Sequence, residues 1–192
     1  MITGACADFT SKKDSQCIEN IVEQTKENLD ANGLTMEQLI ADTGYSSGEA
    51  LKYLGENKID AYIPNFGQYK PEREGFIYNG TLDQYECQRG NKAILPCKGI
   101  RKRHDGYENK QYRSSESVCK NCPLLKECCG EKTKFKKLSH IHKESYDRMH
   151  KKLTENKAYA QRMSRLRSST VEPVLGTLIN FLNMKRVNTR GN

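Results

Sequence analysis

The chain has 192 residues, a net charge of +8 and no Trp, and 29% of its residues are charged. A chain of this length can bury the core of one or two domains. No apolar run approaches the ~20 residues that a membrane-spanning helix needs. Eight cysteines and no recognisable signal peptide indicate reduced thiols or metal ligands in a cytoplasmic protein. The composition argues against a membrane protein and against a disulfide scaffold.

The first third of the sequence alternates between strand-like and helix-like segments. The segments that predict strands are residues 2–9, 36–41 and 59–63. The segments between them predict two helices, the first beginning at Asp14 or Ser15 and the second capped by Ser46 or Ser47. The order strand, helix, strand, helix, strand predicts an α/β fold with a mainly parallel sheet.

The middle of the sequence has a different character. Residues 65–137 are rich in Gly, Lys and Tyr, contain six of the eight cysteines, and show no long periodic segment. Short strands are predicted over residues 75–78 and 84–87. We therefore predict an insertion with its own small fold. The predicted domains are residues 1–64, the cysteine-rich insertion 65–137, and a C-terminal helical part 138–192.

The helical pattern returns near Ser139 and becomes basic. Residues 139–154 and 156–167 predict two helices, and Thr170 is predicted to cap a third with Pro173 in its first turn. The histidines of the first of these helices are interpreted as surface residues. They are His140, His142 and His150.

Positive charge is concentrated toward the end of the sequence. Residues 130–192 carry 15 Lys and Arg against 5 Asp and Glu, whereas residues 1–129 carry 17 against 19. This asymmetry predicts an anionic polymer as partner, with a solvated basic helix face as the alternative.

Two acidic residues stand where a catalytic carboxylate is expected. Asp42 follows a buried strand in residues 41–45 (ADTGY), so it lies at the carboxyl edge where open α/β sheets bind ligands. Glu172 begins an apolar helix in residues 171–178 (VEPVLGTL). Alone, Asp42 could simply form the turn before Gly44, and Glu172 could simply complement a helix dipole.

Together these motifs resemble the second and third acids of DDE-type transposases of insertion sequences, whose catalytic domain is RNase H-like. Residues 59–70 (IDAYIPNFGQYK) and 112–128 (YRSSESVCKNCPLLKEC) resemble the subgroup with a cysteine-containing insertion between those acids. Leu175 stands where the family commonly has an aromatic residue. The resemblance implies a partial RNase H-like fold with a cysteine-rich insertion and C-terminal helices; whether this insertion binds zinc depends on the spacing of its cysteines.

The resemblance implies that Asp42 and Glu172 help to hold Mg²⁺ ions for DNA cleavage and strand transfer in transposition. A two-metal site would bring their carboxylates to roughly 4–8 Å from each other. No acid before Asp8 matches the family's first position. We therefore expect a central to C-terminal fragment of a transposase that does not cleave DNA.

Two other functions are compatible with the same sequence features. One is a non-catalytic zinc-knuckle protein that binds DNA and regulates an intact transposase. The other is a small nuclease in which Asp8 or Asp14 replaces the missing acid. The expected partners are DNA and either the chain itself or an intact transposase, in the bacterial cytoplasm at the nucleoid. Arg162, Arg165 and Arg167 are candidates for phosphate contacts, although they depart from the usual family spacing and could be plain solvated arginines.

The cysteines of the insertion have ligand-like spacing. Cys119 and Cys122 form a C-x₂-C pair, Cys128 follows, and Cys87 lies upstream in a glycine-containing turn. We predict that these four thiolates bind Zn²⁺ tetrahedrally, which would supply folding energy to a small insertion. Cys97 is the alternative to Cys87, and free reduced thiols are the alternative to a metal site.

Overall fold

The computed structural model describes residues 13–65, 69–102 and 108–182. The chain divides into two compact units. Unit 1 consists of Met1–Tyr69 and Glu144–Asn192, and unit 2 of Lys70–Lys143. The strand expected over residues 2–9 lies outside the described residues, and the three domain boundaries stay a prediction. None of the described helices is both long and apolar enough to cross a membrane.

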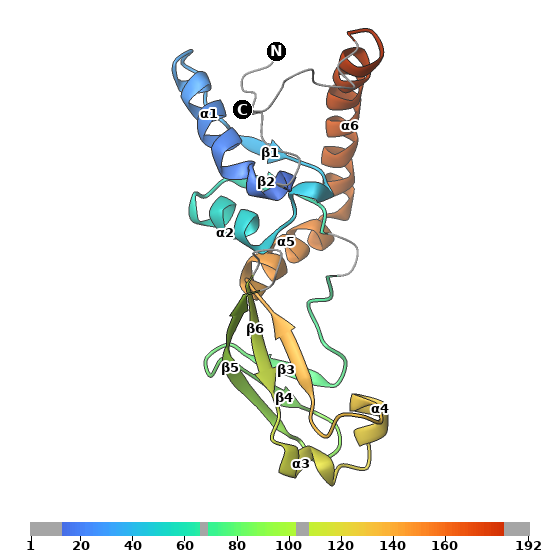
Figure 1. Cartoon of the computed structure of the whole chain (residues 1–192). Coiled ribbons are helices and arrows are strands. Elements are labelled where there is room, and N and C mark those ends of the chain that lie inside the picture. The colour runs from blue at the N-terminus through green and yellow to red at the C-terminus, as the bar shows by residue number, and fades with distance from the viewer. Residues whose placement is uncertain (1–12, 66–68, 103–107, 183–192) are drawn as a thin grey trace, which may run out of the picture. The chain divides into compact units, whose positions relative to one another are not determined.

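Unit 1 combines helices with a small parallel sheet (Figure 1). Its elements are η1 (Asp14–Gln16), α1 (Ile18–Asp30), β1 (Gln38–Ile40), η2 (Thr43–Tyr45), α2 (Gly48–Glu56), β2 (Asp60–Tyr62), α5 (Lys143–Glu155, from its second residue) and α6 (Lys157–Asn180). Strands β1 and β2 pair in parallel, with Leu39 opposite Ala61. The predicted parallel pairing is confirmed for these two strands.

The core of unit 1 combines residues from both of the chain segments that form this unit. Val22 of α1, Leu54 of α2 and Ile63 after β2 are almost completely buried, and Met149 of α5 packs with them. The Ser47 hydroxyl accepts the backbone N–H of Ala50 at 3.1 Å. This cap confirms the predicted start of the second helix.

The C-terminal helix is longer than predicted. Instead of one helix over 156–167 and another from Thr170, α6 runs unbroken with Pro173 inside it. The Thr170 hydroxyl donates to the carbonyl of Leu166, one turn back, and does not act as a cap. The predicted break was wrong because a Thr hydroxyl can be satisfied within a helix. Proline removes only one donor from the helix, although its ring also crowds the preceding turn.

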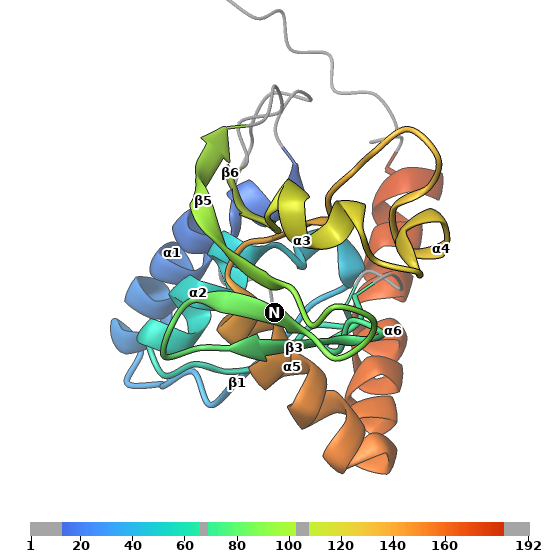
Figure 2. The same ribbon diagram turned by 90° about the horizontal axis from the view of Figure 1, so that it is seen from below.

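Unit 2 is a five-stranded antiparallel sheet in the order β3-β4-β5-β6-β7. Its elements are β3 (Phe76–Asn79), β4 (Gln84–Cys87), β5 (Ile94–Lys102), β6 (Glu108–Arg113), α3 (Glu116–Lys120), α4 (Leu125–Cys129) and β7 (Lys137–His140). The short helices α3 and α4 follow each other along the chain (Figure 2). The strands predicted over 75–78 and 84–87 are confirmed as β3 and β4. The helix predicted from Ser139 was wrong over its first residues, which form β7.

The core of unit 2 lies under one face of the sheet. Leu95 of β5 and Tyr112 of β6 are fully buried, Tyr85 of β4 nearly so, and Cys119 of α3 packs with them. The opposite face of β5 is exposed to solvent and carries apolar side chains, Ile94 and Ile100, as well as cations. The sheet of unit 2 therefore has one buried face and one face exposed to solvent, as an antiparallel sheet allows.

Candidate active site and cysteine pocket

Asp42 lies directly after β1 and caps the turn η2. Its Oδ1 accepts the backbone N–H of Gly44 at 2.8 Å. Asp14 approaches the same glycine, because a Cβ at Gly44 would lie 3.0 Å from both Asp14 Oδ2 and Asp42 Oδ1. Gly44 therefore allows two carboxylates to meet at one backbone position. The turn-forming role considered for Asp42 is present, and it uses only one of the two carboxylate oxygens.

The surroundings of Asp42 carry negative charge. Burial raises the pKa of Tyr45, and the nearby carboxylates of Asp14 and Asp42 raise it further. A field that disfavours a phenolate at this position favours a cation there. The local electrostatics therefore suit the binding of a positively charged group beside Asp42.

Unpaired polar groups occur near the same sheet edge. The N–H of Ala41 still donates to the carbonyl of Tyr62 at 3.2 Å, so β1 and β2 end side by side. Asn65 follows β2, and both polar atoms of its amide are buried without a hydrogen-bond partner among the described residues. The Ser46 hydroxyl after η2 is in the same state. Sequence reasoning missed Asn65, whose only indication was its place shortly after a strand.

Glu172 lies in the second half of α6 and is half exposed. Its Oε1 accepts from Arg167 Nη2 at 3.3 Å. The helix contacts the sheet through Tyr159, whose hydroxyl accepts from Gln38 Nε2 at 3.0 Å. Glu172 follows Tyr159 by about 20 Å along the helix axis at ~1.5 Å per residue. No hydrogen bond or shared partner joins Asp42 and Glu172 in the described residues, so their common metal site stays a prediction.

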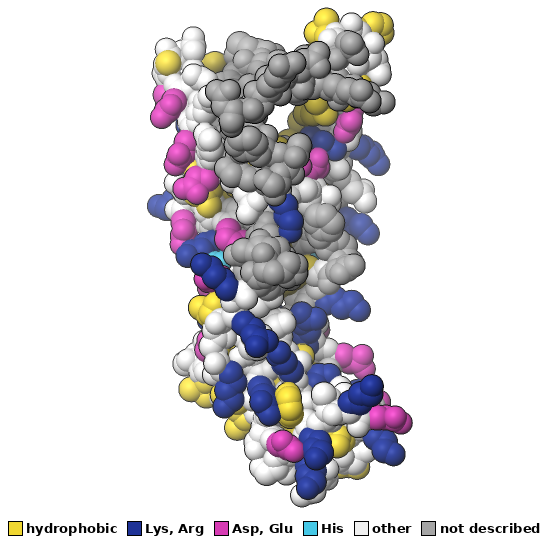
Figure 3. All heavy atoms as spheres, viewed as in Figure 1, with side chains coloured by type: hydrophobic (Ala, Val, Ile, Leu, Met, Phe, Trp, Pro, Cys, Tyr) yellow, Lys and Arg dark blue, Asp and Glu magenta, His cyan; other side chains and the backbone are white. Residues whose placement is uncertain are grey.

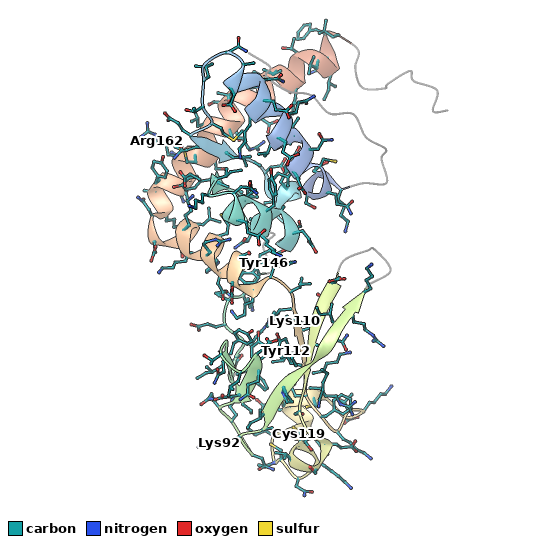
Figure 4. The ribbon with its side chains drawn as sticks, turned by 90° about the vertical axis from the view of Figure 1, so that its left-hand side faces the viewer. Lys92, Lys110, Tyr112, Cys119, Tyr146 and Arg162 are labelled. Atoms are coloured by element: carbon teal, nitrogen blue, oxygen red, sulfur yellow. The ribbon has the colours of Figure 1, made fainter. Side chains whose placement is uncertain are left out.

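The three candidate DNA-binding arginines all lie on α6, but their side chains differ in exposure to solvent. Arg162 and Arg165 are exposed, and Figure 4 labels Arg162 on this helix. The Arg167 side chain is only 20% exposed and is engaged with Glu172. Two of the three guanidinium groups are thus accessible to solvent, and their contact with DNA stays a prediction.

Five cysteines of unit 2 line one pocket of about 310 Å³. They are Cys87, Cys119, Cys122, Cys128 and Cys129. Cys97 is not among the residues that line the pocket, which favours Cys87 in the choice between these two. Cys122 Sγ lies close over the backbone of Gly90, where a Cβ would be 2.4 Å from the sulfur. All four predicted zinc ligands therefore border the same space.

Two of the thiols around this pocket already donate hydrogen bonds to other groups. The Cys87 thiol donates to the carbonyl of Arg89 at 2.9 Å, and the Cys119 thiol donates to Ser114 Oγ at 3.0 Å. Burial and the neighbouring Cys128 raise the pKa of Cys129 to about 11. Among the described residues, no three His, Cys, Asp or Glu side chains form a preassembled metal-binding group. Zinc binding would require these thiols to rotate and lose protons.

A comparison with protein families identifies the chain. The family described as the transposase DDE domain matches residues 86–192, which is more than half of the sequence. The chain belongs to this transposase family. No curated protein and no solved structure matches it. The matched segment includes the five pocket cysteines and Glu172, while Asp42 precedes it. Transposases of this family act on DNA.

This transposase chain also contains a polar network that sequence reasoning missed. In unit 2, Asp83 Oδ1 accepts from the hydroxyls of Tyr78 and Tyr112, each at 2.7 Å, and Oδ2 accepts from Lys110 Nζ at 2.9 Å. Burial opposes the charge of Asp83, but these three donors outweigh it and hold its pKa well below the usual range. Figure 4 labels Lys110 and Tyr112 on β6.

His140 extends this network at the end of β7. The Tyr112 proton goes to Asp83, so its oxygen accepts from His140 Nε2 at 3.0 Å, and Nδ1 accepts from the Tyr85 hydroxyl at 2.9 Å. Burial, and then the charge of Lys143, lower the pKa of His140 to about 4. The interpretation of His140 as a surface residue of a basic helix was wrong. Its partners lie on strands that are far from it in the sequence, so no local sequence pattern could indicate them.

Proposed function

We propose that this chain is part of a DDE transposase in which Asp42 and Glu172 are the second and third acids of an RNase H-like active site. The observation that carries the proposal is the position of Asp42. In a chain of the DDE family, this carboxylate stands at the carboxyl end of a parallel strand, where α/β sheets bind ligands. The reaction that a complete site of this kind performs is DNA cleavage and strand transfer in transposition.

The residues around Asp42 suit Mg²⁺. Carboxylate oxygens are the hard donors that Mg²⁺ prefers, and Gly44 leaves room for two carboxylates at one position. Two bound Mg²⁺ ions would activate water or a DNA 3′-hydroxyl and stabilise the entering and leaving oxygens. Asp42 would hold such an ion through the carboxylate oxygen that does not accept from Gly44. Glu172 would have to release Arg167 to take part.

Asp14 supports a second candidate function. It lies beside Asp42 across Gly44, which is the arrangement that a small nuclease with a replacement acid requires. We favour the transposase assignment because Glu172 lies within the segment matched by the family. In either case we propose that a polypeptide of these 192 residues binds DNA at the bacterial nucleoid. We expect no strand transfer from it, because no residue matches the first acid of the family.

The third candidate is a non-catalytic regulator that binds DNA or an intact transposase. It shares the same DNA contacts, for which Arg162 and Arg165 are accessible. The transposase site and the nuclease site would both bind a metal ion at Asp42, whereas the regulator needs none there.

We also propose that Cys87, Cys119, Cys122 and Cys128 hold a structural Zn²⁺ ion. Support comes from the pocket that all four line. Mass spectrometry of the reduced, folded protein should find one zinc per chain, lost in Cys87→Ser and retained in Cys97→Ser. Sub-stoichiometric zinc in the unaltered protein would reduce the cluster to ordinary thiols. Loss in Cys97→Ser alone would show that Cys97 is the fourth ligand.

Iron-directed cleavage of the polypeptide tests the acidic site without requiring catalysis. Fe²⁺ would replace Mg²⁺, and peroxide would generate hydroxyl radicals that cut the chain near the bound ion. We expect cuts near both Asp42 and Glu172, suppressed by Asp42→Asn. The matched control is Asp30→Asn, an exposed carboxylate at the end of α1, which should leave the pattern unchanged.

The pattern of cuts also separates the candidates. Cuts near Asp14 and Asp42 with none near Glu172 would replace the transposase site by the paired-carboxylate nuclease site. An unaltered pattern in Asp42→Asn would contradict both, and would leave the non-catalytic regulator as the function.

A further inference from the structure

The net positive charge of the chain belongs to unit 2. Residues 70–143 carry 17 Lys and Arg against 9 Asp and Glu, a net charge of +8, whereas unit 1 carries 15 of each. The arginines of α6 are offset within unit 1 by the acidic first part of the sequence. Figure 3 shows many Lys and Arg side chains on the visible face of unit 2. The net positive charge therefore lies on the unit that contains the five-stranded sheet and not on the unit that contains the C-terminal helix.

The exposed face of this sheet contains an open groove of about 830 Å³, lined by residues of β5, β6 and β7, by the start of α3 and by the segments just before α3 and β7. Its apolar residues are Ile94, Pro96, Ile100 and Phe135. We call it the β5–β7 groove. Its charged residues are Lys98, Arg101, Arg113, Lys137 and Glu116. Four cations thus face one carboxylate in a single concave surface.

An irregularity in β5 helps to collect these cations. Lys98 and Arg101 are three residues apart, so a regular strand would point them to opposite faces. The register with β6 shifts between Cys97 and Ile100, and Gly99 has a φ of +119°. A bulge of this kind re-aims the side chains that follow it. Both Lys98 and Arg101 consequently line the groove.

The cations of the groove lie close enough to repel one another. Arg113 and Lys137 stand directly opposite each other in the β6–β7 register. Like charges in this position destabilise a sheet. Neither residue, nor Lys98 or Arg101, has an ion pair within 4.0 Å in the part of the chain that the structure describes. This arrangement favours an anionic partner that would relieve the repulsion.

Arg113 is held in a geometry suited to phosphate. Its guanidinium carbon lies 3.6 Å from the centre of the Phe135 ring. Stacking restrains the plane of the guanidinium group, which is the fork-like donor that matches phosphate oxygens. Because Arg113 already covers one face of Phe135, the ring is less available for stacking on an unpaired base. The groove therefore suits a nucleic-acid backbone better than single-stranded bases.

We propose that the β5–β7 groove binds the sugar-phosphate backbone of duplex DNA. The inference rests on the proposed function only in its choice of DNA as the polyanion. It adds a contact surface in the cysteine-rich unit, in addition to the arginines proposed on α6. Phosphate contacts of this kind position a protein on DNA without reading its sequence.

The test compares two double variants of the full chain that lose the same charge. Lys98→Ala with Arg101→Ala removes two cations of the groove. Lys132→Ala with Lys134→Ala removes two exposed lysines of unit 2 that do not line it. Fluorescence anisotropy would measure binding to one duplex DNA over a range of salt concentrations, and circular dichroism would verify that each variant is folded.

In the unaltered chain, log K should fall steeply with log salt. The groove variant should lower the magnitude of that slope by about 1.8, at ~0.9 per lost phosphate contact, and the control should leave it unchanged. Equal effects in the two variants would overturn the groove while leaving DNA binding and the proposed function intact. Tighter binding to single-stranded DNA or to an acidic peptide would overturn the duplex assignment. Absence of any DNA binding by the unaltered chain would remove both proposals.

Discussion

We expect the titration of His140 to make unit 2 less stable in acid. The pKa of His140 is about 4 in the folded protein, against about 6.5 for an unperturbed histidine. The unfolded chain therefore binds a proton first as pH falls. The free energy of unfolding should be highest above pH ~6.5 and should fall by roughly 2–3 kcal/mol by pH ~4, after allowance for partial exposure. The low pKa of Asp83 adds a further loss below about pH 4.

Urea unfolding between pH 7 and pH 4 measures this loss, and His140→Gln provides the comparison. Glutamine keeps an amide donor for Tyr112 but cannot titrate. We expect the variant to be less stable at pH 7 and to depend less on pH between 6.5 and 4. An equally steep loss in the variant would mean that another group of unit 2 takes up the proton.

Substitution of Gly90 by Ala would test the close approach of the Cys122 sulfur to the backbone. Its φ is +52°, and an added Cβ would lie 2.4 Å from the sulfur. Gly130 is the matched control, because its φ is +76° and an added Cβ would meet nothing within 4 Å. Gly130→Ala should cost roughly 1–3 kcal/mol from the backbone conformation alone, because its ψ of −179° combined with a positive φ lies in a region almost restricted to glycine. Gly90→Ala should cost more and should displace Cys122, measured as a larger drop in melting temperature. Equal drops would show that the sulfur moves away freely.

Among the elements, α6 contains an unusual internal proline. Pro173 cannot donate the helical hydrogen bond to the carbonyl of Ser169, and its ring crowds the same carbonyl. Pro173→Ala should therefore raise the helical signal at 222 nm and stabilise the helix, by up to ~3 kcal/mol on propensity scales. Gly176→Ala is the comparison, with an expected gain of ~1 kcal/mol and no close contact for the new Cβ. A gain for Gly176→Ala but none for Pro173→Ala would show that the proline is accommodated without cost.

The elements also show what the sequence could and could not predict. The helix after Ser47, the parallel strands and the position of Asp42 follow from local patterns of apolar and capping residues, and these expectations agree with the structure. The unbroken α6 did not follow, because a hydroxyl at Thr170 suits a cap and a helix interior alike. The partners of His140 lie 28 and 55 residues away in the sequence. The approach of Asp14 to Gly44 likewise arises only from tertiary packing.

At the scale of the whole molecule, charge and chemistry are divided between the two units. Unit 1 is electrically balanced and contains Asp42 and Glu172, whereas unit 2 contains the net positive charge and the cysteine pocket. A balanced unit with local carboxylates suits metal ions, and a basic unit suits a polyanion. This division agrees with a family that acts on DNA, and it makes the two units separable by experiment.

Zinc removal should affect the two units differently. Unit 2 spans only 74 residues, and a domain of that size buries too little apolar surface to be stable by a wide margin. A bound Zn²⁺ ion would add its binding free energy to folding. Calorimetry with a chelator should therefore lower the melting transition of unit 2 and leave that of unit 1 in place. Cys122→Ser should reproduce the shift, and Cys17→Ser, which removes a thiol from unit 1, should not. If the chelator shifts neither transition, the stability of unit 2 comes from its sheet and from the Asp83 network alone.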